Sequence, residues 1–198
     1  MNPKRVACKF FIHPDASAEV DLHPFIGLFH RFIQAGALPG LLIDVADYAH
    51  VPEGPGVLLV GHEVDYGLDL AGGRAGLLTT RKQLGGASLA DALRSALVWG
   101  LQAIDAIERD GSTGIRFDPS LVSVQVVDRL VAPNDAAGWA SLLEQAAPVL
   151  ADLYGEKVEV SRIQADDPRR CLALQAFCRE AAPASELARR LSGAGGDR

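Results

Sequence analysis

The stretch VLLVGHEVDYGLDL, residues 57–70, places an imidazole and three carboxylates among strand-forming residues. If the segment is one unbroken strand, alternation sets His62 on the face that carries the valines. The other face then gathers the carboxylates of Glu63, Asp65 and Asp69. Carboxylate oxygens suit Mg²⁺ or Ca²⁺, and His62 or Glu63 could serve as a general base. The residue types therefore allow metal or acid–base chemistry, whereas the simpler interpretation is the solvated face of a sheet.

The spacing of these residues matches no known metal or nucleotide motif. An HExxH metal site needs a second histidine one helical turn later, and residues 62–66 lack it. The glycine-rich segments 52–56 and 71–76 both join expected strands, whereas phosphate-binding loops lead into a helix. The segment 83–88 does precede a helix and could hold an anion through main-chain amides, but it lacks the lysine of a P-loop. The sequence identifies no cofactor and no metal site.

A second candidate contact involves the strand expected over 41–48. Asp44 and Asp47 fall on opposite faces of that strand, so at least one should be buried or lie at the strand end, and it would need a donor. Arg81, on a neighbouring strand, is a candidate partner. Such an ion pair would fit a pocket, or it would only fix the strand register. The candidate ligand-facing residues are therefore His62, Glu63, Asp65, Asp69, Arg81 and Asp44.

Hydrophobic periodicity predicts the elements that would position these residues. Helices are expected from Pro24 to Gly36, from the capping residue Ser88 to Gly111, and from a cap at Asn134 or Asp135 to Gly155. Strands are expected at 5–12, 41–48, 57–70, 77–83, 157–164 and 171–177, and a hairpin with arms at 115–117 and 121–127 around a turn at 118–120.

Strand groups with short turns, interleaved with helices, indicate an α+β fold. We expect a mainly antiparallel sheet with three principal amphipathic helices packed on it. Residues 1–180 are expected to form one domain, with a two-lobed split near residue 112 as an alternative. Residues 181–198 are expected to form a short helix and a mobile tail.

Composition excludes several classes of function. The chain has 198 residues and a formal net charge of −6, and its basic residues are scattered, so it would repel a phosphate backbone. Nucleic acid is therefore not an expected partner. No segment has the length and apolarity of a membrane span or a signal peptide, which indicates a cytoplasmic protein. The three cysteines, Cys8, Cys171 and Cys178, argue against a disulfide framework and a thiolate metal site.

Four segments, HPFIGLFHRFIQ, LLIDVADYAHVPEGPGVLLVGHEVDYGLD, GGRAGLLTTRKQ and VVDRLVAPND, together resemble a family of bacterial proteins of about this length that has no assigned activity. The resemblance covers most of residues 22–135, and its most specific part is DVADYAHVPEGPGVLLVGHE. It implies a cytosolic bacterial protein. It carries over no functional residue, cofactor or partner.

Two functions from different classes follow from these observations. The first is a non-catalytic binding or interaction module that self-associates, or binds a protein partner, through an apolar sheet edge or helix face. The alternative is a small metal-dependent or general-base enzyme that uses the strand with His62, Glu63 and Asp65. A third hypothesis is a split barrel that holds a flavin, and it is indicated only by the three consecutive strands with short turns expected over 41–83.

Overall fold

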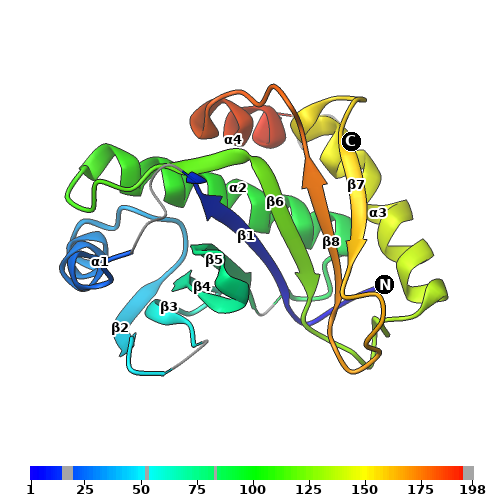
Figure 1. Cartoon of the computed structure of the whole chain (residues 1–198), viewed down its shortest axis with the longest axis horizontal. Helices are drawn as coiled ribbons and strands as arrows, with labels where there is room; N and C mark the ends of the chain where they lie inside the picture. The colour runs from blue at the N-terminus through cyan, green and yellow to red at the C-terminus, as the bar shows by residue number, and fades with distance from the viewer. Residues whose placement is uncertain (15–19, 52–53, 83, 194–198) are drawn as a thin grey trace.

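The computed structural model describes residues 1–14, 20–51, 54–82 and 84–193, and these fold into one antiparallel sheet with helices packed on it (Figure 1). The strands are β1 (Val6–Ile12), β2 (Leu42–Tyr48), β3 (Gly56–Gly61), β4 (Val64–Asp69), β5 (Gly76–Arg81), β6 (Phe117–Val126), β7 (Glu159–Ile163) and β8 (Leu172–Phe177). The eight strands lie in the order β2-β3-β4-β5-β1-β6-β8-β7, and β2 and β7 form the two edges. The α+β class predicted from the sequence is confirmed.

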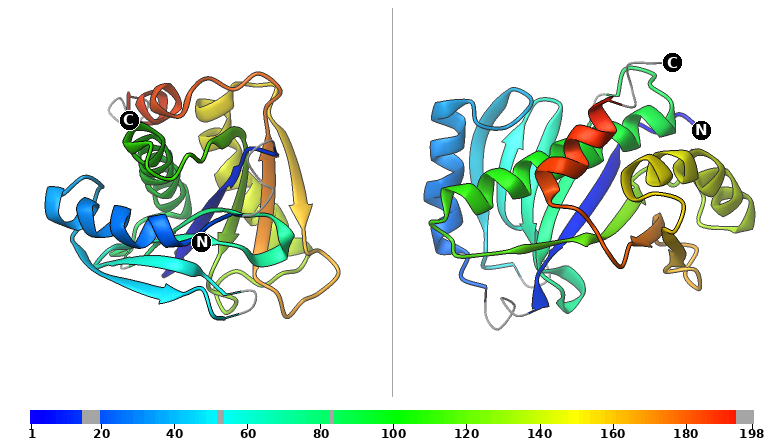
Figure 2. Two further views of the ribbon diagram at one scale, coloured as in Figure 1. Left: turned by 60° about the vertical axis from the view of Figure 1, so that its left-hand side comes forward. Right: turned by 90° about the horizontal axis from the view of Figure 1, so that it is seen from above.

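Helices cover one face of this sheet. They are α1 (His23–Ala35), α2 (Leu89–Asp110), α3 (Ala136–Tyr154) and α4 (Ala184–Gly193). Helix α1 packs on β2 and β3, α2 packs mainly on β1 and β5, and α3 contacts β8. Helix α4 packs on α2 and α3 instead of on the sheet, and the right-hand view of Figure 2 shows it alongside α2. Among the described residues, no helix is long and apolar enough to cross a membrane.

The central helix α2 forms where local signals place it. The hydroxyl of Ser88 accepts a hydrogen bond from the main-chain N–H of Asp91 at 3.1 Å, which caps the first turn. Gly100 then lets the helix approach the sheet closely. A Cβ at this position would lie 3.1 Å from Cys8 Sγ and 3.2 Å from Phe10 Cε2. The small residue therefore sets the distance between α2 and β1.

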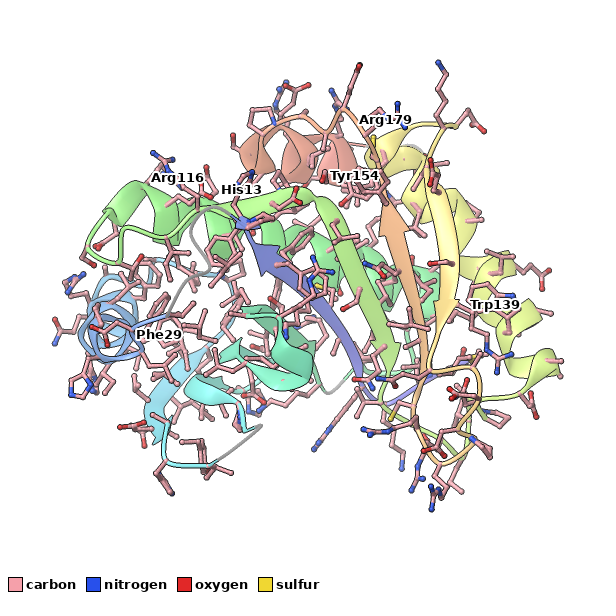
Figure 3. The ribbon with its side chains drawn as sticks, in the orientation of Figure 1. His13, Phe29, Arg116, Trp139, Tyr154 and Arg179 are labelled. Carbon is pink, nitrogen blue, oxygen red and sulfur yellow. The ribbon has the colours of Figure 1, made fainter. Side chains whose placement is uncertain are left out.

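Aromatic side chains anchor α1 and α3 to the sheet. Phe29 lies on the side of α1 that faces the strands and is fully buried (Figure 3). Tyr154, at the end of α3, donates a hydrogen bond from its hydroxyl to the carbonyl O of Pro119 on β6 at 2.7 Å. Burial raises the pKa of the Tyr154 hydroxyl, so this donor stays protonated. The Tyr154 contact joins α3 to a strand residue 35 positions away in the sequence.

The prediction of one unbroken strand over 57–70 was wrong. The segment is a hairpin, in which β3 ends at Gly61 and β4 begins at Val64, with His62 and Glu63 in the turn. Gly61 permits this turn because a Cβ there would lie 2.4 Å from the carbonyl O of Val64. The turn reverses the chain, and Val60 pairs with Asp65 on one face while Val64 is buried on the other.

Two further predictions were wrong. The expected hairpin around 118–120 is instead an irregularity within the single strand β6, where the pairing with β1 shifts between Phe10 and Phe11. The apolar run Leu41, Leu42, Ile43 and Val45 predicts that the start of β2 is buried on both faces. It lies instead at the sheet edge, where Leu41 is 65% exposed and Ile43 is 56% exposed. The expected short C-terminal helix is α4, and the expected mobile tail after residue 193 lies outside the described residues.

Candidate functional site

The face of the sheet turned away from the helices carries the candidate site. Alternation along β1 sends Val6, Cys8 and Phe10 into the core beneath α2. Lys9 and Phe11 therefore project from the opposite face. The same alternation on the neighbouring strands places Leu78 of β5 on this face, together with polar and small side chains of β6 and β8.

Two cross-strand rows form the floor of a groove on this face. In one row Lys9 pairs with Ser123 of β6, which pairs with Gln175 of β8. In the adjacent row Ala7 pairs with Gln125, which pairs with Ala173. Because paired residues share a face of the sheet, these side chains point into the same space. The floor is thus polar at its centre and lined by small residues beside it.

Two connections between strands wall this groove. One is the β4–β5 connection, which includes a short 3₁₀ helix at Ala71–Gly73 followed by Arg74. The other is the β7–β8 loop, which contributes residues 164, 166, 167 and 170. The left-hand view of Figure 2 shows both connections projecting on one side of the sheet. Together with the floor they enclose a cavity of about 790 Å³, named here the open-face groove.

A nearly buried ion pair lies at one end of the open-face groove. Lys9 Nζ donates to Asp69 Oδ2 at 2.6 Å and to the carbonyl O of Ala71 at 3.3 Å. The side chains are only 8% and 13% exposed, respectively. A buried charge needs a partner, and Asp69 supplies it. Asp69 is among the residues predicted from the sequence to face a ligand and Lys9 is not, although a lysine within the apolar run VACKFFI is a usable signal.

The ring of Phe11 brings a second cation to the same end of the groove. The guanidinium carbon of Arg74 lies 4.2 Å from the Phe11 ring centroid, and Lys9 Nζ lies 5.5 Å from it. Arg74 is exposed and forms no ion pair with any residue that the structure describes. Stacking on an aromatic ring orients a guanidinium and leaves its N–H groups available.

The polar side chains of the floor lack protein partners. Gln125, Gln175 and Ser123 are half-buried, and within the described part of the chain their side chains make no hydrogen bond. Side-chain amides can each donate and accept. The centre of the open-face groove therefore presents uncharged hydrogen-bonding groups to whatever occupies it.

The carboxylates expected to converge are instead held separately. Asp65 Oδ1 accepts from Lys82 Nζ at 2.7 Å and from the main-chain N–H of Gly61 at 3.2 Å. Glu63 Oε2 accepts from the main-chain N–H of Leu41 at 3.1 Å, beside the start of β2. Asp65 and Asp69 do share the open face, as alternation along β4 predicts, but each is paired with its own lysine.

His62 lies in the β3–β4 turn and is exposed, so its expected place among the buried valines was wrong. The reason is the hairpin, which removes His62 from the alternation of either strand. Among the described residues, no group of three or more histidine, cysteine or acidic side chains is placed to hold a metal ion.

Arg81 lies on the helix-covered face, away from Asp69. Its guanidinium stacks 3.8 Å above the Trp99 ring and donates to the main-chain O of Glu63 at 2.9 Å and to Ser95 Oγ at 3.3 Å. Burial lowers the pKa of Arg81, an effect that the negative charge of Glu63 opposes. Arg81 therefore joins β5 to α2 and the β3–β4 turn.

The expected ion pair between Asp44 and Arg81 was wrong, because β2 and β5 are separated by β3 and β4. Asp44 and Asp47 are both exposed on the edge strand, and each accepts a hydrogen bond from a main-chain N–H close by in sequence. Neither needs the buried donor that the sequence led us to expect.

A second cavity, of about 880 Å³, lies between α2, α3 and α4. Its cation Arg94 donates to Asp152 Oδ2 at 2.5 Å and to the carbonyl O of Leu191 at 3.2 Å, which ties the three helices together. Since this arginine is used to hold the helix layer, the open-face groove is the stronger candidate.

Comparisons with known proteins add nothing to this geometry. No protein-family model matches the chain, and neither a curated protein nor a solved structure is significantly similar to it.

Proposed function

We propose that the protein is a non-catalytic binding module that takes a small polar organic ligand in the open-face groove. The observation that carries the proposal is the floor itself. Gln125, Gln175 and Ser123 are half-buried, turned toward one space and without hydrogen-bond partners among the described residues. Half-buried polar groups without partners contribute the most binding free energy when a ligand forms hydrogen bonds with them.

The charges in the groove support binding over catalysis. A general base needs a lone pair free to accept a proton from substrate. The groove carboxylates are instead engaged in ion pairs that give them a structural role: Asp69 Oδ2 accepts from Lys9, and Asp167 accepts from Arg169 Nε at 3.1 Å and lies 3.8 Å from Arg170 Nε. These pairs fix the shape of the groove, and the uncharged groups at its centre remain available for recognition.

Native mass spectrometry of freshly purified protein is the first test, because a retained ligand adds a defined mass. The compound identified is then titrated against the double variant Gln125→Leu/Gln175→Leu by calorimetry. We expect the Kd to rise at least tenfold, since the loss of one good hydrogen bond to a half-buried group suffices for that. The matched control is Gln102→Leu, at an exposed position on α2, which should leave the Kd unchanged.

Glu63→Gln separates this proposal from the enzymatic alternative. The substitution retains the shape of the side chain in the β3–β4 turn but removes its charge. Under the proposal it leaves ligand affinity as it was, whereas a general base at Glu63 would make turnover of the compound depend on it. Conversion of the retained compound by the wild-type protein, abolished in Glu63→Gln, would refute the non-catalytic function.

A further inference from the structure

We propose that the ligand of the open-face groove carries an anionic group, a carboxylate or a phosphate, which binds between Arg74 and Lys9. The inference rests on the proposed function and adds the chemical class of the ligand.

One end of the groove carries an excess positive charge. Lys9 and Arg74 both lie against the ring of Phe11, at 5.5 and 4.2 Å from its centroid. Asp69 neutralises Lys9, and Arg74 has no carboxylate partner in the described chain. This end therefore keeps the one uncompensated positive charge of Arg74, which an anion bound beside it would neutralise.

The donors needed to bind an anion are in place at this end. An ammonium has three N–H donors, and Lys9 uses two of them, toward Asp69 and Ala71. The guanidinium of Arg74 is stacked on Phe11, so its N–H groups can form the two parallel hydrogen bonds that suit a carboxylate or a phosphate. Low exposure of Lys9 strengthens the attraction, because water screens it less.

The other end of the groove lacks such an excess. The β7–β8 loop contributes Asp166, which is exposed, and Asp167, which is held by Arg169 and Arg170. Hydrogen bonds from Arg169 lower the pKa of Asp167, so the loop keeps its negative charges. An anionic group therefore binds at the Arg74 end, while the uncharged body of the ligand extends over Gln125 and Gln175.

Matched pairs of compounds test the inference. The probes are glucose 6-phosphate against glucose, and succinate against succinamide, with inorganic phosphate alone as a fifth arm. Binding is followed by calorimetry and by amide chemical shifts. We expect the charged member of at least one pair to bind at least tenfold more tightly than its neutral partner, and the affinity to fall as salt is added. The pair that responds separates a phosphate from a carboxylate.

Arg74→Gln should weaken binding of the charged member of the responding pair at least tenfold and leave binding of the neutral member unchanged. Arg179→Gln is the matched control, because it removes the same charge from an exposed position past the far end of β8 (Figure 3). Equal binding of charged and neutral members, or equal effects of the two substitutions, would overturn the inference.

The outcomes also separate this inference from the proposed function. A neutral compound that binds and depends on Gln125 and Gln175 would leave the groove as a binding site but refute the anionic class. No retained mass in native spectrometry and no binding in any arm would refute both. Binding of phosphate alone that Arg74→Gln does not alter counts as non-specific and also overturns the inference.

Discussion

Breaking the ion pair between Lys9 and Asp69 should destabilise the protein strongly. Lys9→Met removes the ammonium and leaves the carboxylate of Asp69 in a site where its side chain is 13% exposed. Asp69→Leu leaves the ammonium of Lys9, whose side chain is 8% exposed, without a counter-charge. Removing one partner of a buried pair costs about 3–5 kcal/mol. Since the groove admits some water, we expect each single variant to lose about 3 kcal/mol of unfolding free energy at neutral pH.

The double variant Lys9→Met/Asp69→Leu should recover most of that loss. Replacing both partners leaves no uncompensated charge, and two apolar side chains of similar size fill the same space. A buried pair replaced in this way is often neutral or stabilising. We therefore expect the double variant to lie within about 1 kcal/mol of the wild type, so the single effects are strongly non-additive.

Urea denaturation followed by tryptophan fluorescence measures all four proteins, since the chain has two tryptophans. A loss of about 3 kcal/mol corresponds to a fall in Tm of about 6–12 °C for a chain of this size. The m-value should stay constant, which shows that the same transition is compared. Additive single effects, or single effects below about 1 kcal/mol, would show that the pair is effectively solvated and refute the account of the groove.

Three further predictions concern the helix layer. Ser88→Ala removes the cap of α2 and should lower the free energy of unfolding by about 1 kcal/mol, measured by urea denaturation. Gly100→Leu forces α2 off β1 and should cost at least about 1–3 kcal/mol, whereas a solvated Gly100 would tolerate it. A hydrogen bond from Ser112, and then the contact with Arg31 of α1, lowers the pKa of Asp110. The ionised carboxylate therefore stabilises the fold above the ordinary aspartate pKa, and this stabilisation is lost as the pH falls through the lower pKa of the folded state. Asp110→Asn should remove that part of the acid dependence in denaturation curves recorded across the acid range, and an unchanged profile would contradict it.

Local signals in the sequence were sufficient to predict the helices. Ser88 and Gly111 bound α2 because a hydroxyl cap and a left-handed glycine satisfy groups within one turn of the chain. The start of α3 at Asp135 follows from the same chemistry, with the carboxylate accepting from Gly138 N at 2.7 Å. These interactions depend only on neighbours in sequence, so they are visible without the fold.

The strands were harder to predict because their burial depends on distant partners. The apolar start of β2 looks like a central strand, yet the sheet ends there and Leu41 is exposed. The turn at His62 and Glu63 was missed because neither residue is a typical turn former, although Gly61 comes just before them, where a Cβ would lie 2.4 Å from the carbonyl O of Val64. Asp69 shares a face of β4 with Asp65, as alternation predicts, but it is nearly buried because it pairs with Lys9, which is 60 residues away in the sequence.

The two faces of β1 show how one strand can serve both the core and the groove. Its inward residues, Cys8 among them, are packed beneath α2, and burial raises the pKa of the Cys8 thiol, which donates to the carbonyl O of Ala96 at 3.2 Å. Its outward residues meet no helix, yet Lys9 and Phe11 are buried as well. Among the described residues, the β4–β5 connection contacts them, since Lys9 donates to the carbonyl O of Ala71 and Arg74 stacks on the ring of Phe11. The burial that makes the pair with Asp69 costly to break is thus the same burial that would strengthen the attraction of this groove for an anion.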